Sequence, residues 1–170
     1  MSGWLSKLFK SSKTDERLFC SAVILAAGRG ERMLGINKLF AELDGEPVLV
    51  HTLRAFELCP EVDEIVVVAR QEEIGDIGVL IGDCGFSKVT KVIRGGERRQ
   101  DSVYIGLMEL SPKSQLAAIH DGARPLVTQR IISDTIRAAA QYNAAAPGVP
   151  VKDTIKVVKS GEVVNTPDRS

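Results

Sequence analysis

Short apolar runs that alternate with helical patterns are the feature that most constrains how this chain folds. Between the runs, apolar residues such as Leu49, Leu53 and Phe56 recur at helical spacing. Nearly continuous apolar strands that alternate with helices are typical of a mostly parallel sheet covered by helices on both faces. The sequence therefore predicts an α/β fold. The expected strands are Ser21–Ala26, Glu64–Ala69, Val89–Arg94, Leu116–His120 and Ala144–Val151.

Helical stripes are expected in three further places, with different strength. Val103, Leu107 and Leu110 keep helical spacing, and a second stripe runs from Ile131 to Ala139. Residues 71–83 give a weaker signal, because three glycines within them disfavour a helix.

The two ends of the chain depart from the alternating pattern. Residues 1–18 are predicted to be a mobile extension, with a docking helix as the alternative, and the α/β domain is expected over residues 19–150. Residues 151–170 contain two short runs around Lys159–Glu162, which predict a hairpin. No helix is predicted to cover this hairpin, so we expect it to project as an arm and to pair with a second copy of the chain.

Composition excludes several classes of function. The 22 basic and 22 acidic residues cancel, so no general attraction to nucleic acid or to an anionic membrane is expected. No apolar run approaches the roughly 18 residues of a membrane span, and no secretory signal is recognisable. The three scattered cysteines fit neither a disulfide framework nor a zinc site. They indicate reduced thiols and a cytoplasmic location.

Unusual residues gather where the predicted strands end. Clusters follow four of the five strands, at residues 26–32, 94–102, 120–125 and 151–154. The end of the second strand, residues 69–71, carries nothing comparable. Because ligands of open α/β sheets bind outside the carboxyl ends of the strands, the four clusters are expected to form one pocket.

Small residues in these clusters favour a nucleoside triphosphate as the ligand. Ala26, Ala27, Gly28 and the pair Gly95–Gly96 let a base, ribose or phosphate approach the backbone, whose N–H groups bind phosphate oxygens. The stretch is neither a P-loop nor a dinucleotide fingerprint, because it lacks the Gly-Lys-Ser/Thr sequence and the third glycine. A Rossmann-like, nucleotide-binding sheet is therefore predicted.

Charged and polar residues at the same rim suggest the chemistry. Arg32 and Lys38 can balance phosphate charge. Asp121 is expected to accept a sugar hydroxyl, to bind Mg²⁺ through water or to cap a turn, and Ser102 either binds ligand or caps a helix. No metal cage and no nucleophilic triad is evident. Phosphoryl or nucleotidyl transfer needs neither, because it depends on positioning and on cations where charge develops.

Six motifs resemble those of the 2-C-methyl-D-erythritol 4-phosphate cytidylyltransferase family. They are AAGRGERM, INKLF, GGERRQDSV, HDGARP, VPVKDTIK and TPDR, and the resemblance covers Ser21 to Arg169. The resemblance implies that methylerythritol phosphate attacks the α-phosphate of CTP, with Mg²⁺, to give 4-diphosphocytidyl-methylerythritol and pyrophosphate. It also implies a homodimer, in which the arm of one subunit reaches the other.

The resemblance also implies a role for each matching residue. Ala26, Ala27 and Gly28 would line the cytidine triphosphate site, while Gly96, Glu97, Ser102 and Asp121 would contact the nucleotide. Arg32 and Lys38 would stabilise the transition state. The residues expected to bind the acceptor are Asp121, Gly122, Arg124, Thr154 and Arg169, the last of these also being a catalytic candidate.

Some features of the sequence depart from the family pattern. Glu97 stands where aspartate is common, Gly122 where alanine is common, and family members continue beyond Arg169. The chain is therefore expected to lack the C-terminal segment of the family. Three alternatives remain: a ribitol 5-phosphate cytidylyltransferase, a CTP-binding fragment without turnover, and a structural dimerisation module.

Overall fold

A parallel four-stranded sheet forms the centre of the molecule. The computed structural model describes residues 17–28, 37–150 and 152–168. The sheet has the order β5-β4-β1-β6, and each neighbouring pair is parallel. This arrangement confirms the predicted α/β class and, within about a residue, four of the predicted strands. They are β1 (Cys20–Ala26), β4 (Glu64–Ala69), β5 (Val89–Arg94) and β6 (Leu116–Asp121).

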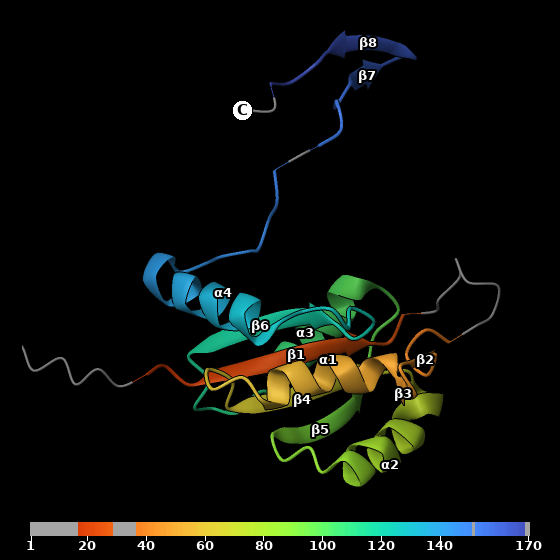
Figure 1. The fold of residues 1–170 in the computed structure, drawn as a ribbon, viewed down its shortest axis with the longest axis vertical. Coiled ribbons are helices and arrows are strands. Elements are labelled where there is room, and N and C mark those ends of the chain that lie inside the picture. The colour runs from red at the N-terminus through yellow and green to blue at the C-terminus, as the bar shows by residue number, and fades with distance from the viewer. Residues whose placement is uncertain (1–16, 29–36, 151, 169–170) are drawn as a thin grey trace, which may run out of the picture.

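Helices cover both faces of this sheet (Figure 1). Three of them, α1 (Val48–Glu57), α2 (Ile74–Cys84) and α4 (Gln129–Tyr142), share one core with the side chains of Ala22 and Ile24. The expected stripe on α1 is confirmed, because its apolar residues Leu49, Leu53 and Phe56 are buried.

Helix α3 (Arg99–Met108) covers the opposite face of the sheet. Its buried residues are Ser102 and Gly106, whereas Leu107, in the expected stripe, is partly exposed. Gly106 sits directly against β1: a Cβ at this position would lie 2.4 Å from Val23 Cγ1. Close packing of a small residue therefore determines which side of α3 meets the sheet, and the predicted apolar stripe on this helix was wrong.

Two other expectations are corrected by the structure. The glycine-rich stretch forms a short 3₁₀ turn, η3 (Gln71–Glu73), followed by α2, whose Ile77 is fully buried. Burial of its apolar face outweighs the cost of its glycines. The fifth strand is absent from residues 144–150, which are exposed and carry no regular structure. The predicted fifth strand was wrong for these residues: they do not pair with β6, whose outer edge has no partner among the described residues.

The predicted hairpin is confirmed. Strands β7 (Val157–Lys159) and β8 (Glu162–Asn165) pair antiparallel, and Ser160 and Gly161, at φ +48° and +87°, form the two-residue turn between them. All described residues of this arm, 152–168, are exposed. Figure 1 shows the arm extending away from the sheet and its helices.

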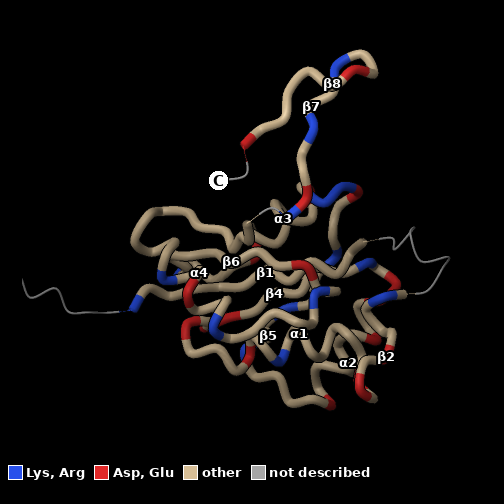
Figure 2. The backbone as a smooth tube through the Cα atoms, turned by 45° about the horizontal axis from the view of Figure 1, so that its top comes forward, with Lys and Arg blue, Asp and Glu red and all other residues tan. Residues whose placement is uncertain are grey.

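A second, smaller hairpin precedes α1. It consists of β2 (Glu42–Leu43) and β3 (Glu46–Pro47). Lys and Arg are interspersed with Asp and Glu along the chain, as Figure 2 shows. In the described part of the chain, no helix has the length and apolar character needed to cross a membrane. The predictions for residues 1–16, and those for Arg32 and Arg169, lie outside the described residues.

Candidate functional site

A cleft of about 1310 Å³ opens at the carboxyl ends of the strands. It joins the ends of β1, β4, β5 and β6, as expected for an open parallel sheet. Gly122 and Thr154 do not line it, and no described residue of the arm does. The structure thus brings together three of the four predicted clusters. The predicted residues that line the cleft are Ala26, Ala27, Gly28, Lys38, Gly96, Glu97, Ser102, Asp121 and Arg124.

The loop after β5 is held close to the loop after β1. The Gly95 N–H donates to the Ala69 carbonyl at 2.9 Å, which keeps the loop against β4. A Cβ at Gly95 would lie 2.7 Å from both Ala27 Cβ and Ser102 Oγ. Only glycine fits there without displacing a neighbour, so Gly95 lets the loop after β5 pack directly against the loop after β1 at the cleft wall.

Ser102 shapes this loop from the first turn of α3. Its side chain is almost fully buried, at 4% exposure, and its hydroxyl accepts a 3.1 Å hydrogen bond from the Gly96 N–H. The carboxylate of Asp101 accepts a hydrogen bond from the Arg98 N–H at 3.2 Å and caps the helix. Capping is therefore performed by Asp101, and Ser102 fixes the position of Gly96 at the cleft wall.

Asp121 lies at the end of β6 between two arginines. Its carboxylate is 2.8 Å from the Arg99 guanidinium and 2.9 Å from that of Arg124. Partial burial tends to raise the pKa of Asp121, but the hydrogen bond from Arg99 and the charges of both arginines outweigh it, so the pKa lies below its usual value. Asp121 is therefore ionised at neutral pH, and two cations stand beside it.

The residues next to Asp121 in sequence are structural. His120 packs its ring 5.1 Å from that of Phe56 in the core, and burial lowers the pKa of this histidine. Gly122 is buried beneath the cleft, where its N–H donates to the Leu25 carbonyl at 2.8 Å and its carbonyl accepts from Thr52 Oγ1 at 2.8 Å. These bonds fix the chain just before Arg124 and thereby position the rim.

The end of β4, which the sequence did not indicate as part of the site, also lines the cleft. Arg70, Gln71 and Glu72 contribute to the lining. Arg70 forms ion pairs with Glu72, at 3.3 Å, and with Glu73. The available signal was an arginine directly after a buried strand and two acidic residues within one turn of it. Arg99 lies in the predicted cluster 94–102, but its pairing with Asp121 was not predicted, because the two residues are 22 positions apart in the chain.

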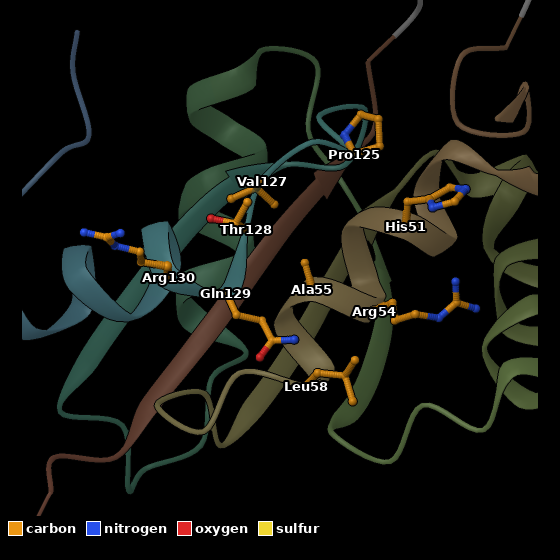
Figure 3. Close-up of a pocket in the computed structure, with 9 residues that line it drawn as sticks. All are labelled: His51, Arg54, Ala55, Leu58, Pro125, Val127, Thr128, Gln129 and Arg130. Atoms are coloured by element: carbon orange, nitrogen blue, oxygen red, sulfur yellow. The ribbon is translucent and has the colours of Figure 1, made fainter. Parts of the chain in front are cut away.

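A second, shallower groove of about 480 Å³ lies between α1 and the start of α4. Figure 3 shows His51, Arg54 and Leu58 on one side, with Thr128 and Gln129 on the other. His51 Nε2 donates a 2.7 Å hydrogen bond to the Leu43 carbonyl, and Arg54 forms an ion pair with Glu46. Apart from Pro125, none of the motif residues lines this groove. The larger cleft is therefore the candidate site.

The donor set of the cleft suits a polyphosphate. Glycine-rich backbone and several Lys and Arg residues line it, and backbone N–H groups and cations are the groups that bind phosphate oxygens. Within the described ranges no group of three or more His, Cys, Asp or Glu side chains is placed to hold a metal ion. A single carboxylate is sufficient for Mg²⁺ when substrate phosphates provide its other ligands.

The sequence was compared with models of known protein families, and one family matches. The family model of 2-C-methyl-D-erythritol 4-phosphate cytidylyltransferase matches residues 20–170. The chain belongs to this family. The resemblance seen in the sequence motifs is thereby confirmed.

Relatives in the cytidylyltransferase family support the assignment over most of the chain. The proteins of that name from Halalkalibacterium halodurans and Caldanaerobacter subterraneus are 47% and 45% identical over 88% of this chain. The match covers 65% of the first relative and 67% of the second. This chain therefore spans about two thirds of the length of these relatives.

Solved structures of the same family share the fold of this chain. The 4-diphosphocytidyl-2C-methyl-D-erythritol synthase of Anaerococcus prevotii superposes with a TM-score of 0.76 at 29% identity. The superposition covers 89% of this chain and 64% of that one. A Francisella tularensis 2-C-methyl-D-erythritol 4-phosphate cytidylyltransferase superposes with a TM-score of 0.61 at 26% identity, covering 89% of this chain and 67% of that one.

Proposed function

We propose that the protein joins CTP to 2-C-methyl-D-erythritol 4-phosphate, giving 4-diphosphocytidyl-2-C-methyl-D-erythritol and pyrophosphate. The cleft carries this proposal: it combines open backbone, several cations and one ionised aspartate at the carboxyl edge of the sheet. A phosphate oxygen of the acceptor would attack the α-phosphorus of CTP. The bond from that phosphorus to the bridging oxygen would break, and pyrophosphate would leave. Such a transfer depends on positioning and charge stabilisation.

The nucleotide is assigned to the walls formed by β1 and β5. Ala26, Ala27 and Gly28 would let the triphosphate lie against the backbone. Gly96 and Glu97 would meet the cytosine, with Ser102 holding Gly96 in place. Arg32 and Lys38 would supply the cations at the α-phosphate, and losing either should slow turnover by about 10²-fold or more.

Mg²⁺ is proposed to accompany CTP. Asp121 fits this role because its carboxylate is ionised and lies on the cleft. The ion, when bound, would neutralise phosphate charge and favour departure of pyrophosphate. Arg99 and Arg124 would hold the carboxylate in position and would offer cations to the acceptor phosphate.

The arm is proposed to serve a second copy of the chain. Its described residues are exposed and do not line the cleft of their own chain, and they include the acceptor-binding candidate Thr154. A homodimer that places the arm of one subunit over the cleft of the other would bring Thr154 and Arg169 to the acceptor. A cytoplasmic location is proposed from the three free thiols, two of which are buried.

Pyrophosphate release tests the proposal. The 170-residue chain would be incubated with CTP, Mg²⁺ and either methylerythritol phosphate or ribitol 5-phosphate. Turnover with methylerythritol phosphate alone is expected, and turnover with ribitol 5-phosphate alone would overturn the acceptor assignment. Because the chain spans about two thirds of its relatives, a CTP-binding unit without turnover is the second candidate. CTP binding without pyrophosphate release would support this candidate, and absence of CTP binding would contradict both.

A further inference from the structure

A partly buried polar cluster lies directly beside Lys38. It consists of Asn37, Arg70 and Glu73. Glu73 is only 4% exposed, and its Oε1 accepts hydrogen bonds from Asn37 Nδ2 and from the Arg70 guanidinium. The other carboxylate oxygen, Glu73 Oε2, and Arg70 Nε are buried without a hydrogen-bond partner among the described residues. Burying ionic groups with unmet hydrogen bonds is costly, so the cluster contributes little to stability by itself.

Asn37 links this cluster to the turn that carries Lys38. Its side-chain Oδ1 accepts a 3.1 Å hydrogen bond from the Leu39 N–H. Its main-chain carbonyl accepts hydrogen bonds from the N–H groups of Phe40, at 3.2 Å, and Ala41, at 3.1 Å. One residue therefore closes the turn with both its side chain and its backbone.

Glu73 determines how the Asn37 amide is oriented. A carboxylate only accepts hydrogen bonds, so it binds the NH₂ group of the amide and leaves Oδ1 facing the Leu39 N–H. Leu39 is in turn buried in the core. Lys38 is thus held between an asparagine fixed by Glu73 and a leucine fixed by the core, and its side chain lines the cleft.

We propose that Asn37 and Glu73 together position Lys38, and we call this hydrogen-bonded pair the pin. The pin directs the Lys38 ammonium group toward the triphosphate of the nucleotide. This inference rests on the proposed function. The lysine side chain is flexible, so a fixed backbone limits the region that its ammonium group can reach and keeps the charge near one part of the cleft. Arg70 supports the pin from the other side by sharing Glu73 Oε1.

Hydrogen exchange tests the pin without any nucleotide. Glu73→Ala should accelerate exchange of the Leu39, Phe40 and Ala41 amides by about tenfold or more, while the amides of β4 keep their protection. Glu72→Ala is the matched control, because Glu72 also pairs with Arg70 but is exposed and lies outside the Asn37 contact. Unchanged exchange in the turn would overturn the pin, as would uniform acceleration of all amides.

Ligand affinity tests the consequence for Lys38. Glu73→Ala should weaken CTP binding by about tenfold and leave cytidine binding unchanged, because only CTP carries the triphosphate. Glu73→Gln, which can still accept from Asn37, should recover part of the loss. An equal loss for both ligands, or no loss, would overturn the positioning role. If the unmodified chain fails to bind CTP, the proposed function fails instead, and the exchange result still decides whether the pin exists.

Discussion

The carboxylate of Asp121 is shared by Arg99 and Arg124, whose guanidinium groups lie 2.8 Å and 2.9 Å from its two oxygens. The three residues come from the start of α3, the end of β6 and the loop after β6. One negative charge thus keeps two cations at the cleft. Because all three side chains remain partly open to solvent, this triad can exchange partners when a ligand or an ion enters.

Replacing Asp121 by asparagine should separate the effects of magnesium and of the arginines. Without Mg²⁺, Asp121→Asn should bind CTP at least as tightly as the unmodified chain, since Arg99 and Arg124 are released. The gain in CTP affinity on adding Mg²⁺ should shrink by about tenfold, the size of one interaction with a charged group. Calorimetry with and without Mg²⁺ measures both. Glu72→Gln, another carboxylate of the cleft, is the control, and an equal magnesium effect in all three proteins would contradict the role.

Gly95 should tolerate no larger residue. In Gly95→Ala the added Cβ would lie 2.7 Å from Ala27 Cβ and Ser102 Oγ and 3.1 Å from Val68 Cγ1. Overpacking of this kind costs about 1–3 kcal/mol, and displacement of the loop should weaken CTP binding at least tenfold. Urea unfolding and calorimetry check the two effects. Gly148→Ala, where a Cβ meets nothing within 4 Å, should change neither. Normal CTP binding by Gly95→Ala would show that the loop can move freely.

Much of the sheet and part of the cleft could be predicted from local patterns. Strands such as Glu64–Ala69 are buried on both faces and therefore appear as continuous apolar runs. Because parallel strands all end at the same edge of the sheet, residues that follow them, such as Ala27, Gly96 and Asp121, could be predicted to meet at one rim. Small residues that allow a ligand close to the backbone, and an aspartate directly after a strand, can be recognised in the sequence alone.

Contacts between distant side chains could not be predicted in this way. Asn37 and Glu73 are 36 residues apart, and neither lies in a periodic pattern. The face of α3 is determined by the fit of Gly106 against Val23, which apolar periodicity does not encode. The expected strand at 144–151 shows the same limit: an apolar run does not reveal whether it pairs with another strand, and the described part, 144–150, pairs with none.

Glycines within α2 should be replaceable with a gain in stability. A Cβ at Gly78 meets nothing within 4 Å, so Gly78→Ala should raise the free energy of unfolding by about 0.5–1 kcal/mol through helix propensity. Gly85 ends the same helix in the left-handed region, at φ +66°. Gly85→Ala should therefore lower stability by about 1 kcal/mol. Urea unfolding should show a higher free energy of unfolding for Gly78→Ala and a lower one for Gly85→Ala. A loss of stability in Gly78→Ala would contradict this account of α2.

Glu61 should make the stability of the fold depend on pH. Glu61 is only 6% exposed, and its carboxylate accepts a 2.5 Å hydrogen bond from Ser133 Oγ. The carboxylate also pairs with Arg137, and this pair joins α4 to the loop after α1. The hydrogen bond from Ser133 is the largest of the influences that hold the pKa of Glu61 below its usual value. A lowered pKa in the folded state stabilises the fold fully above the unfolded value of about 4.3, and this contribution is lost as pH falls through the folded-state pKa.

Glu61→Gln should therefore lower the free energy of unfolding at pH 7 by about 1–3 kcal/mol, and the difference from the unmodified chain should vanish in acid. Urea unfolding of both proteins at a series of pH values from neutral down to about 3 measures the difference directly. Glu162→Gln, in the exposed strand β8, should leave stability unchanged at every pH and serves as the control. A difference between Glu61→Gln and the unmodified chain that stays constant across this range would show that Glu61 acts through shape and packing, and not through its charge.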